Sequence, residues 1–170
     1  MVKGKGVSKG IGIGHTKVLK NEEVKLTDFK VENKENELKY FKKCLSDVIE
    51  DTKKVVEKLS GTEADIMNAY LMILQDPTLT EETERLIQED GYNAGYAAKV
   101  GFETVEEVFK NMDDEYMSAR ASDIEDMKNK VINKIINKAE LDLSNLPENT
   151  ILVGKDLSTS DTAKLNLNSV

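Results

Sequence analysis

The spacing of hydrophobic residues predicts that helices make up most of this chain. Between residues 32 and 60, apolar positions are separated alternately by three and four residues, as on one face of a long helix. These positions are Leu38, Phe41, Leu45, Val48, Thr52, Val55 and Leu59. Because the seam runs for about three heptads, we expect a second helix to pack along it.

Further helices are predicted over residues 63–75, 78–90, 93–109 and 111–138. The helix over 63–75 carries apolar residues on nearly every side, whereas the helix over 111–138 has a single apolar stripe. The helix over 93–109 has weak points at Gly95 and Gly101, because glycine is a poor helix former.

Capping signals predict where two of these helices begin. Ser60 and Glu63 match the capping-box pattern, and so do Thr78 and Glu81. Pro77 separates the two helices, because the residue before a proline avoids the helical conformation.

Strands are predicted at both ends of the chain. Residues 1–20 alternate apolar residues with glycines, and residues 150–153 form a buried strand that precedes a short helix over 161–168. Strands on either side of a helical series indicate a helical insertion into a small α/β unit. The few strands at hand leave that unit incomplete. The predicted fold class is therefore mostly α.

Charge is distributed unevenly along the chain, whose net charge is −8. Residues 61–126 hold 17 acidic and 4 basic residues. Because an acidic surface repels a phosphate backbone, we do not expect nucleic acid as a partner. Two interpretations stay open: the acids keep the domain soluble, or they attract a basic protein surface.

The composition also indicates where in the cell the protein is located. No apolar run reaches the roughly 18 residues of a membrane span, and residues 1–15 lack the apolar segment of a secretory signal. The single cysteine, Cys44, cannot form an internal disulfide, which favours a cytoplasmic protein. Cys44 lies beside the apolar seam, so core packing is favoured over a role as nucleophile.

Residues typical of catalysis are scarce. His15 is the only histidine, and no carboxylate that could orient its ring is near it in sequence, so an ordinary strand or turn residue is favoured over a phosphoryl acceptor. The run Gly10-x-Gly12-x-Gly14 lacks the spacing of a phosphate-binding loop and favours a tight turn between strands. No histidine–cysteine cluster or EF-hand spacing indicates a metal site.

Two segments are candidates for a binding surface. The helix over 63–75 cannot bury all its apolar residues on one side, so part of it lies in the deep core or on a docking surface, for which methionine is well suited. The second candidate combines Tyr116, Met117 and Arg120 with neighbouring acids. Packing within a bundle and solvation remain the alternative explanation for both.

Four stretches together resemble the N-terminal part of Enzyme I of the bacterial phosphoenolpyruvate:sugar phosphotransferase system. They are 6–14 (GVSKGIGIG), 66–76 (IMNAYLMILQD), 113–126 (DDEYMSARASDIED) and 150–166 (TILVGKDLSTSDTAKLN). The last two are the most specific. Together the four stretches run from one end of the chain to the other.

The resemblance implies a domain organisation and a partner. Residues 1–31 and 144–170 would belong to a phosphohistidine α/β subdomain, interrupted by a helical subdomain over 32–143 that binds the small carrier protein HPr. The docking face of HPr is basic, which would give the acidic block a use. By this resemblance the docking residues are Asp65, Ala69, Met72, Ile73, Leu79, Tyr116, Met117 and Arg120.

The resemblance also implies chemistry, and here the sequence departs from the family. The family transfers a phosphoryl group from phosphoenolpyruvate to a histidine in a G-G-x-[TS]-S-H-[TA] motif and then to HPr. That motif is not in this sequence, and His15 does not occupy the family's catalytic position. Lys9 and Thr159 also replace prolines that are frequent in the family. We therefore expect a piece truncated before the active site, without a catalytic residue, which keeps HPr docking.

Further expectations follow from that truncation. No cofactor is expected in this chain, because the magnesium site and the homodimer contacts of the family belong to a C-terminal domain. Missing strands would leave open strand edges with exposed apolar residues such as Ile151, Val153 and Leu165. Two alternatives remain: a non-catalytic helical interaction module, and a paralogous phosphotransferase such as nitrogen-related Enzyme I or a dihydroxyacetone kinase subunit.

Overall fold

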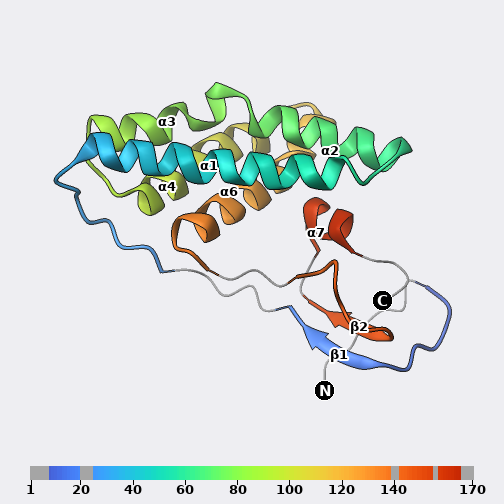
Figure 1. Ribbon diagram of the computed structural model, residues 1–170. Helices are drawn as coiled ribbons and strands as arrows, with labels where there is room; N and C mark the ends of the chain where they lie inside the picture. The colour runs from blue at the N-terminus through green and yellow to red at the C-terminus, as the bar shows by residue number, and fades with distance from the viewer. Residues whose placement is uncertain (1–7, 20–24, 139–141, 155–156, 166–170) are drawn as a thin grey trace, which may run out of the picture.

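The computed structural model describes residues 8–19, 25–138, 142–154 and 157–165. Long helices form one body, a two-stranded sheet lies apart from it, and a short helix lies between the two (Figure 1). The elements in chain order are β1 (His15–Val18), α1 (Lys34–Val56), α2 (Gly61–Leu74), α3 (Pro77–Gln88), α4 (Ala94–Lys110), α5 (Glu115–Ala119), α6 (Ala121–Ile135), β2 (Thr150–Val153) and α7 (Thr159–Lys164). The prediction of a mostly helical chain is confirmed.

The apolar seam of α1 packs as its spacing predicts. Phe41, Val48 and Thr52 are buried, and the remaining seam positions are half-buried against the same core. Helices α2, α3, α4 and α6 all pack against α1, so the seam has several partners rather than one. Cys44 is also buried, and burial raises the pKa of its thiol, which keeps it protonated.

The contact between α3 and α4 depends on Gly101. A Cβ atom at Gly101 would lie 2.2 Å from Thr83 Oγ1 and 2.7 Å from the Thr83 backbone nitrogen. Only a residue without a side chain allows the two helices to come this close. The glycine that looks like a weak point in the sequence is therefore a requirement of packing.

Both predicted capping boxes are wrong. Ser60 precedes α2 as its N-cap residue, but its side chain makes no capping bond. Helix α3 begins at Pro77 rather than after Thr78, because the side chain of Asp76 accepts a hydrogen bond from the Thr78 backbone N–H at 2.9 Å. A proline in the first turn suits this arrangement, since its nitrogen has no hydrogen to satisfy.

The single helix predicted over 111–138 is also wrong, because the structure divides it. Asp114 starts α5 by accepting a hydrogen bond from the Met117 backbone N–H at 3.0 Å. At Arg120 the backbone N–H bonds to Met117, three residues back, which is a tighter turn than that of an α-helix. Helix α6 begins immediately afterwards, at Ala121.

Strands β1 and β2 pair in parallel, with His15 opposite Thr150 and Val18 opposite Val153. The prediction that β2 is a buried strand is wrong, since only Thr150 is buried along it. Ile151 and Val153 are exposed, as expected for open strand edges, whereas Leu165 is half-buried. Residues 1–7, where an earlier strand is predicted, lie outside the described residues, as do 166–170 at the end of the predicted last helix.

A buried ion pair joins α4 to α6. Glu106 and Lys128 are 5 % and 9 % exposed, and the Lys128 ammonium donates to Glu106 at 2.8 Å. Burial acts to raise the pKa of Glu106, but hydrogen bonds from Lys110 and Lys128 outweigh it, so the pKa is lowered from its ordinary value of 4.5. The pair therefore stabilises the fold while Glu106 is ionised.

We predict that Gly101→Ala lowers the free energy of unfolding by about 2 kcal/mol, because α3 and α4 must move apart to admit the methyl group. Alanine's higher helix propensity offsets only about 1 kcal/mol of that overpacking. Gly12→Ala is the matched control, since a Cβ atom there would meet no atom within 4 Å. Urea unfolding measures both changes, and equal stability of the two variants would contradict the packing role of Gly101.

We predict that Glu106→Gln lowers the free energy of unfolding at pH 7 by about 3 kcal/mol, because it leaves the Lys128 ammonium buried without its main partner. Glu107→Gln, at the next and exposed position of α4, should change it by less than about 0.5 kcal/mol.

The loss of unfolding free energy caused by Glu106→Gln should also depend on pH. Because the folded-state pKa of Glu106 is lowered, its contribution is complete above pH 4.5 and is lost as the pH falls through the folded-state pKa. Urea unfolding across this range should show the wild type and Glu106→Gln converging in acid. A difference that stays constant would contradict the ion pair as its cause.

Candidate partner-docking face

Helix α2 has one side in the core and an opposite side that is open. Met67, Tyr70 and Leu74 face inward and are at most 2 % exposed. Asp65 and Met72 lie on the other side of the helix, and Met72 is 73 % exposed. The helix is apolar nearly all round, as the sequence indicates, and its outer apolar surface is available to a partner.

The other predicted docking residues of this region differ in exposure. Ala69 and Ile73 are half-buried at the border of the open side of α2. Leu79, on α3, is 2 % exposed and belongs to the hydrophobic core. The prediction of Leu79 as a surface docking residue does not agree with this placement, because a side chain enclosed by the core cannot touch a partner.

The second group of predicted residues lies on and just after α5. Tyr116 is 66 % exposed, while Met117 and Arg120 are half-buried. The Arg120 guanidinium donates to the Tyr116 hydroxyl and lies 4.9 Å from the centre of its ring. Hydrogen bonds with Tyr116 and Asp123 raise the pKa of Arg120. Arg120 is thus held in place before any partner arrives. From here on, the name docking residues refers to the predicted set without Leu79: Asp65, Ala69, Met72, Ile73, Tyr116, Met117 and Arg120.

Partly buried hydrogen bonds connect the elements that carry the docking residues. Tyr70, on the inner side of α2, donates from its hydroxyl to Asp126 Oδ2 on α6 at 2.9 Å. Burial, together with the nearby Asp126 charge, raises the pKa of Tyr70 far above its ordinary value, so the hydroxyl remains a donor. On the same helix, Asp123 accepts from Arg120 at 3.0 Å. The first turns of α6 therefore tie α2 to the segment that follows α5.

Helix α7 attaches to the same turns of α6. Thr159 donates to Asp123 Oδ1 at 2.8 Å, and Ser160 donates to Asp126 Oδ2. Sequence reasoning identified the segment 113–126 but did not predict these pairings. The available signal was the spacing of Arg120, Asp123 and Asp126, which places polar residues beside the buried stripe of α6 rather than on its solvent side.

The other candidates from the sequence lie elsewhere. His15 is exposed on β1. Gly14 needs to be glycine, because a Cβ atom there would lie 2.0 Å from the Asn149 carbonyl oxygen. Within the described ranges, no three histidine, cysteine, aspartate or glutamate side chains are grouped as metal ligands would be. None of the described helices combines the length and apolar character needed to cross a membrane.

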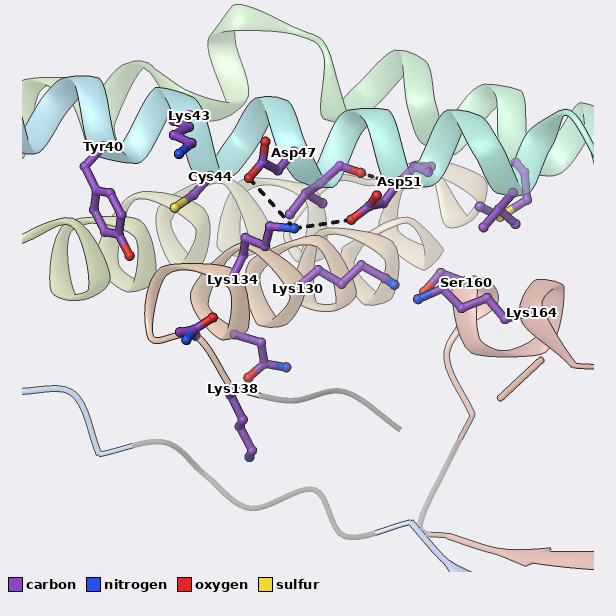
Figure 2. A pocket seen from close by; sticks show the side chains of 16 residues that line it. Tyr40, Lys43, Cys44, Asp47, Asp51, Lys130, Lys134, Lys138, Ser160 and Lys164 are labelled. Carbon is purple, nitrogen blue, oxygen red and sulfur yellow. Dashed lines mark hydrogen bonds and ion pairs between the residues drawn. The ribbon is translucent and has the colours of Figure 1, made fainter. Parts of the chain in front are cut away.

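A groove of about 570 Å³ lies between α1, α6 and α7 (Figure 2), and none of the docking residues is among the residues that line it. Five lysines and two aspartates are among the side chains that line it. Lys134 bridges to Asp51 at 3.3 Å and to Asp47 at 3.8 Å. These contacts join α6 to α1, so part of the charge in the groove serves the packing of helices.

The sequence of this chain is similar to those of known proteins from one enzyme family. Residues 3–120 match the family model for the N-terminal domain of phosphoenolpyruvate-utilising enzymes. The phosphoenolpyruvate-protein phosphotransferase of Buchnera aphidicola subsp. Baizongia pistaciae is 31 % identical over all of this chain and 31 % of its own length. That of Bacillus subtilis is 32 % identical over 97 % of this chain and 30 % of its own length. The chain thus spans about a third of the length of these curated relatives.

Solved structures show the same likeness. The solution structure titled Enzyme I (nEIt) is 31 % identical, has a TM-score of 0.82, and is matched over 96 % of this chain and 68 % of its own. The structure of the N-terminal domain of Enzyme 1 - Nitrogen is 18 % identical and has a TM-score of 0.69, which shows that the fold is shared. The match covers 92 % of this chain and 66 % of that structure's chain. The chain therefore belongs to the family of phosphoenolpyruvate-utilising enzymes, in which it corresponds to the N-terminal domain found in Enzyme I.

Proposed function

We propose that this chain is the carrier-docking part of an Enzyme I-type phosphotransferase, which passes a phosphoryl group from phosphoenolpyruvate through a phosphohistidine to HPr in sugar uptake. Two findings support the proposal. The relatives named phosphoenolpyruvate-protein phosphotransferase match the chain from end to end, and α2 presents Met72 to solvent at the position that the resemblance assigns to docking.

The exposure of Met72 is the observation that carries the proposal. A methionine that is 73 % exposed gains little from the fold, whereas covering it on a partner removes apolar surface from water. Ile66, at 43 %, and Tyr116, at 66 %, are also unusually exposed for large apolar side chains. Exposed apolar residues mark a protein–protein contact where they form one contiguous patch, which is the arrangement we propose for these three.

Charge supports the choice of partner. Asp65 lies on the open side of α2, and Asp113, Asp114 and Glu115 are exposed at the start of α5. An apolar surface with an acidic border suits a small protein whose docking face is basic, because complementary charge speeds encounter and orients the partner. The same charge disfavours a nucleic acid.

The chemistry of the proposal lies outside the docking residues. A neutral imidazole is a good nucleophile and, once phosphorylated, a good leaving group, which suits it to phosphoryl relay. His15 lies on β1, in the small sheet, and we assign it no catalytic role. This chain would bind and orient the carrier. We place the magnesium site and the dimer contacts of the parent enzyme in another of its domains.

We predict that Met72→Ala weakens the binding of purified HPr about 10-fold, since truncating an apolar anchor at an interface costs roughly 1–2 kcal/mol. Isothermal titration of the 170-residue chain measures the affinity. Phe29→Ala is the control, because Phe29 is another exposed apolar residue, at 59 %, but precedes α1 and is not a docking residue. HPr resonances near its own histidine should shift on titration with the wild type.

Two outcomes would contradict the proposal. An absence of any binding between the wild-type chain and HPr would rule out the docking function. Equal affinities for the wild type, Met72→Ala and Phe29→Ala would mean that HPr binds elsewhere on the molecule.

A further inference from the structure

The Asp123 carboxylate connects the docking residue Arg120 to helix α7, which lies much later in the sequence. Asp123 is 6 % exposed and uses its two oxygens separately. Oδ2 accepts from the Arg120 guanidinium at 3.0 Å, and Oδ1 accepts from the Thr159 hydroxyl at 2.8 Å. Any rotation of this carboxylate therefore alters both contacts at once.

Two hydrogen bonds to Asp126 also attach α7 and α2 to α6, and neither involves a docking residue. Asp126 accepts from Ser160 of α7 and from Tyr70 of α2. Ser160 and Tyr70 are 2 % and 0 % exposed, and Tyr70 faces the core rather than the open side of α2. Of the Thr159 and Ser160 hydrogen bonds from α7 to α6, the one from Thr159 reaches the carboxylate that also holds Arg120, and the one from Ser160 does not.

Near-complete burial makes the Asp123 contacts interdependent. A carboxylate enclosed by protein needs its hydrogen-bond donors, because losing one leaves an unsatisfied charge in a poorly solvated site. When Thr159 or Arg120 moves away, Asp123 is therefore no longer fixed in the orientation that serves the donor that remains. The side chains of such a network strengthen or weaken together rather than independently.

We propose that Asp123 is a positioning residue that couples carrier docking at Arg120 to the attachment of α7 on α6. This inference rests on the proposed docking function for its partner. Thr159 holds Asp123, Asp123 holds Arg120, and Arg120 presents its guanidinium beside Tyr116 at the docking face. By reciprocity, a carrier that binds the held form of Arg120 also strengthens the attachment of α7 to α6.

The first experiment needs no partner. Hydrogen exchange of the α7 amides is measured in the wild type and in Arg120→Met, relative to the amides of α1. We expect exchange in α7 to become severalfold faster in Arg120→Met while α1 is unchanged. Arg85→Met is the matched control, because Arg85 of α3 binds Glu82, Glu89 and Asp90 and contacts neither Asp123 nor α7. Equal α7 exchange in the two variants would overturn the coupling.

The second experiment is a double-mutant cycle on HPr affinity, measured by NMR titration. Thr159→Val keeps the shape of Thr159 but removes its donor, and Ser160→Ala removes the donor to Asp126. We expect Thr159→Val to weaken binding about fivefold in the wild-type background, and by less than about twofold when Arg120→Met is present. Ser160→Ala should have the same effect in both backgrounds.

The outcomes separate a positioning role from a structural one. If Thr159→Val and Ser160→Ala both act equally in the two backgrounds, α7 is attached to α6 without any link to Arg120, and the inference is wrong. If wild-type HPr binding is absent, the docking function fails, while the hydrogen-exchange comparison of Arg120→Met with Arg85→Met still decides whether Arg120 and α7 are coupled.

Discussion

Two carboxylates at the start of α6, the buried Asp123 and the half-buried Asp126, determine how the segments of this protein meet. Asp123 and Asp126 lie where the helix turns into the core, and a charge in that position is tolerated only when hydrogen-bond donors surround it. The donors come from segments far apart in sequence: Tyr70 of α2, Arg120 after α5, and Thr159 and Ser160 of α7. Satisfying the two carboxylates therefore brings α2, α5 and α7 to one end of α6.

This arrangement explains why α2 can carry a binding surface. Its inner side fills the core with Met67, Tyr70 and Leu74, so the stability of the helix does not depend on its outer side. The outer side is then free to hold an exposed methionine, which adapts its shape to a partner at little cost. Exposed acidic residues keep a domain soluble whether or not a partner binds, so the proposed docking needs only the acids beside the docking residues.

The sequence was sufficient for the helical body, whereas the predicted docking residues stay a prediction. Periodicity identified the α1 seam and the apolar character of α2, since both follow from spacing along a single helix. Helix starts were less predictable. Asp76 competes with Thr78 for the role of cap, and only the observed Asp76–Thr78 bond shows which one starts α3. Leu79 was predicted as a docking residue from the resemblance to the family, yet α3 places it in the core.

What the sequence determined by itself is the set of helices, the acidic middle of the chain and the family to which it belongs, because these depend on residue types and their local spacing. The tertiary structure decided three further points: the break at Arg120, the need for glycine at position 101, and the partners of Asp123 and Asp126. The last two depend on distances between atoms that are far apart along the chain, which no local pattern contains. The break at Arg120 is local, but it follows from which carbonyl the Arg120 N–H bonds, and the spacing of apolar residues does not specify that choice.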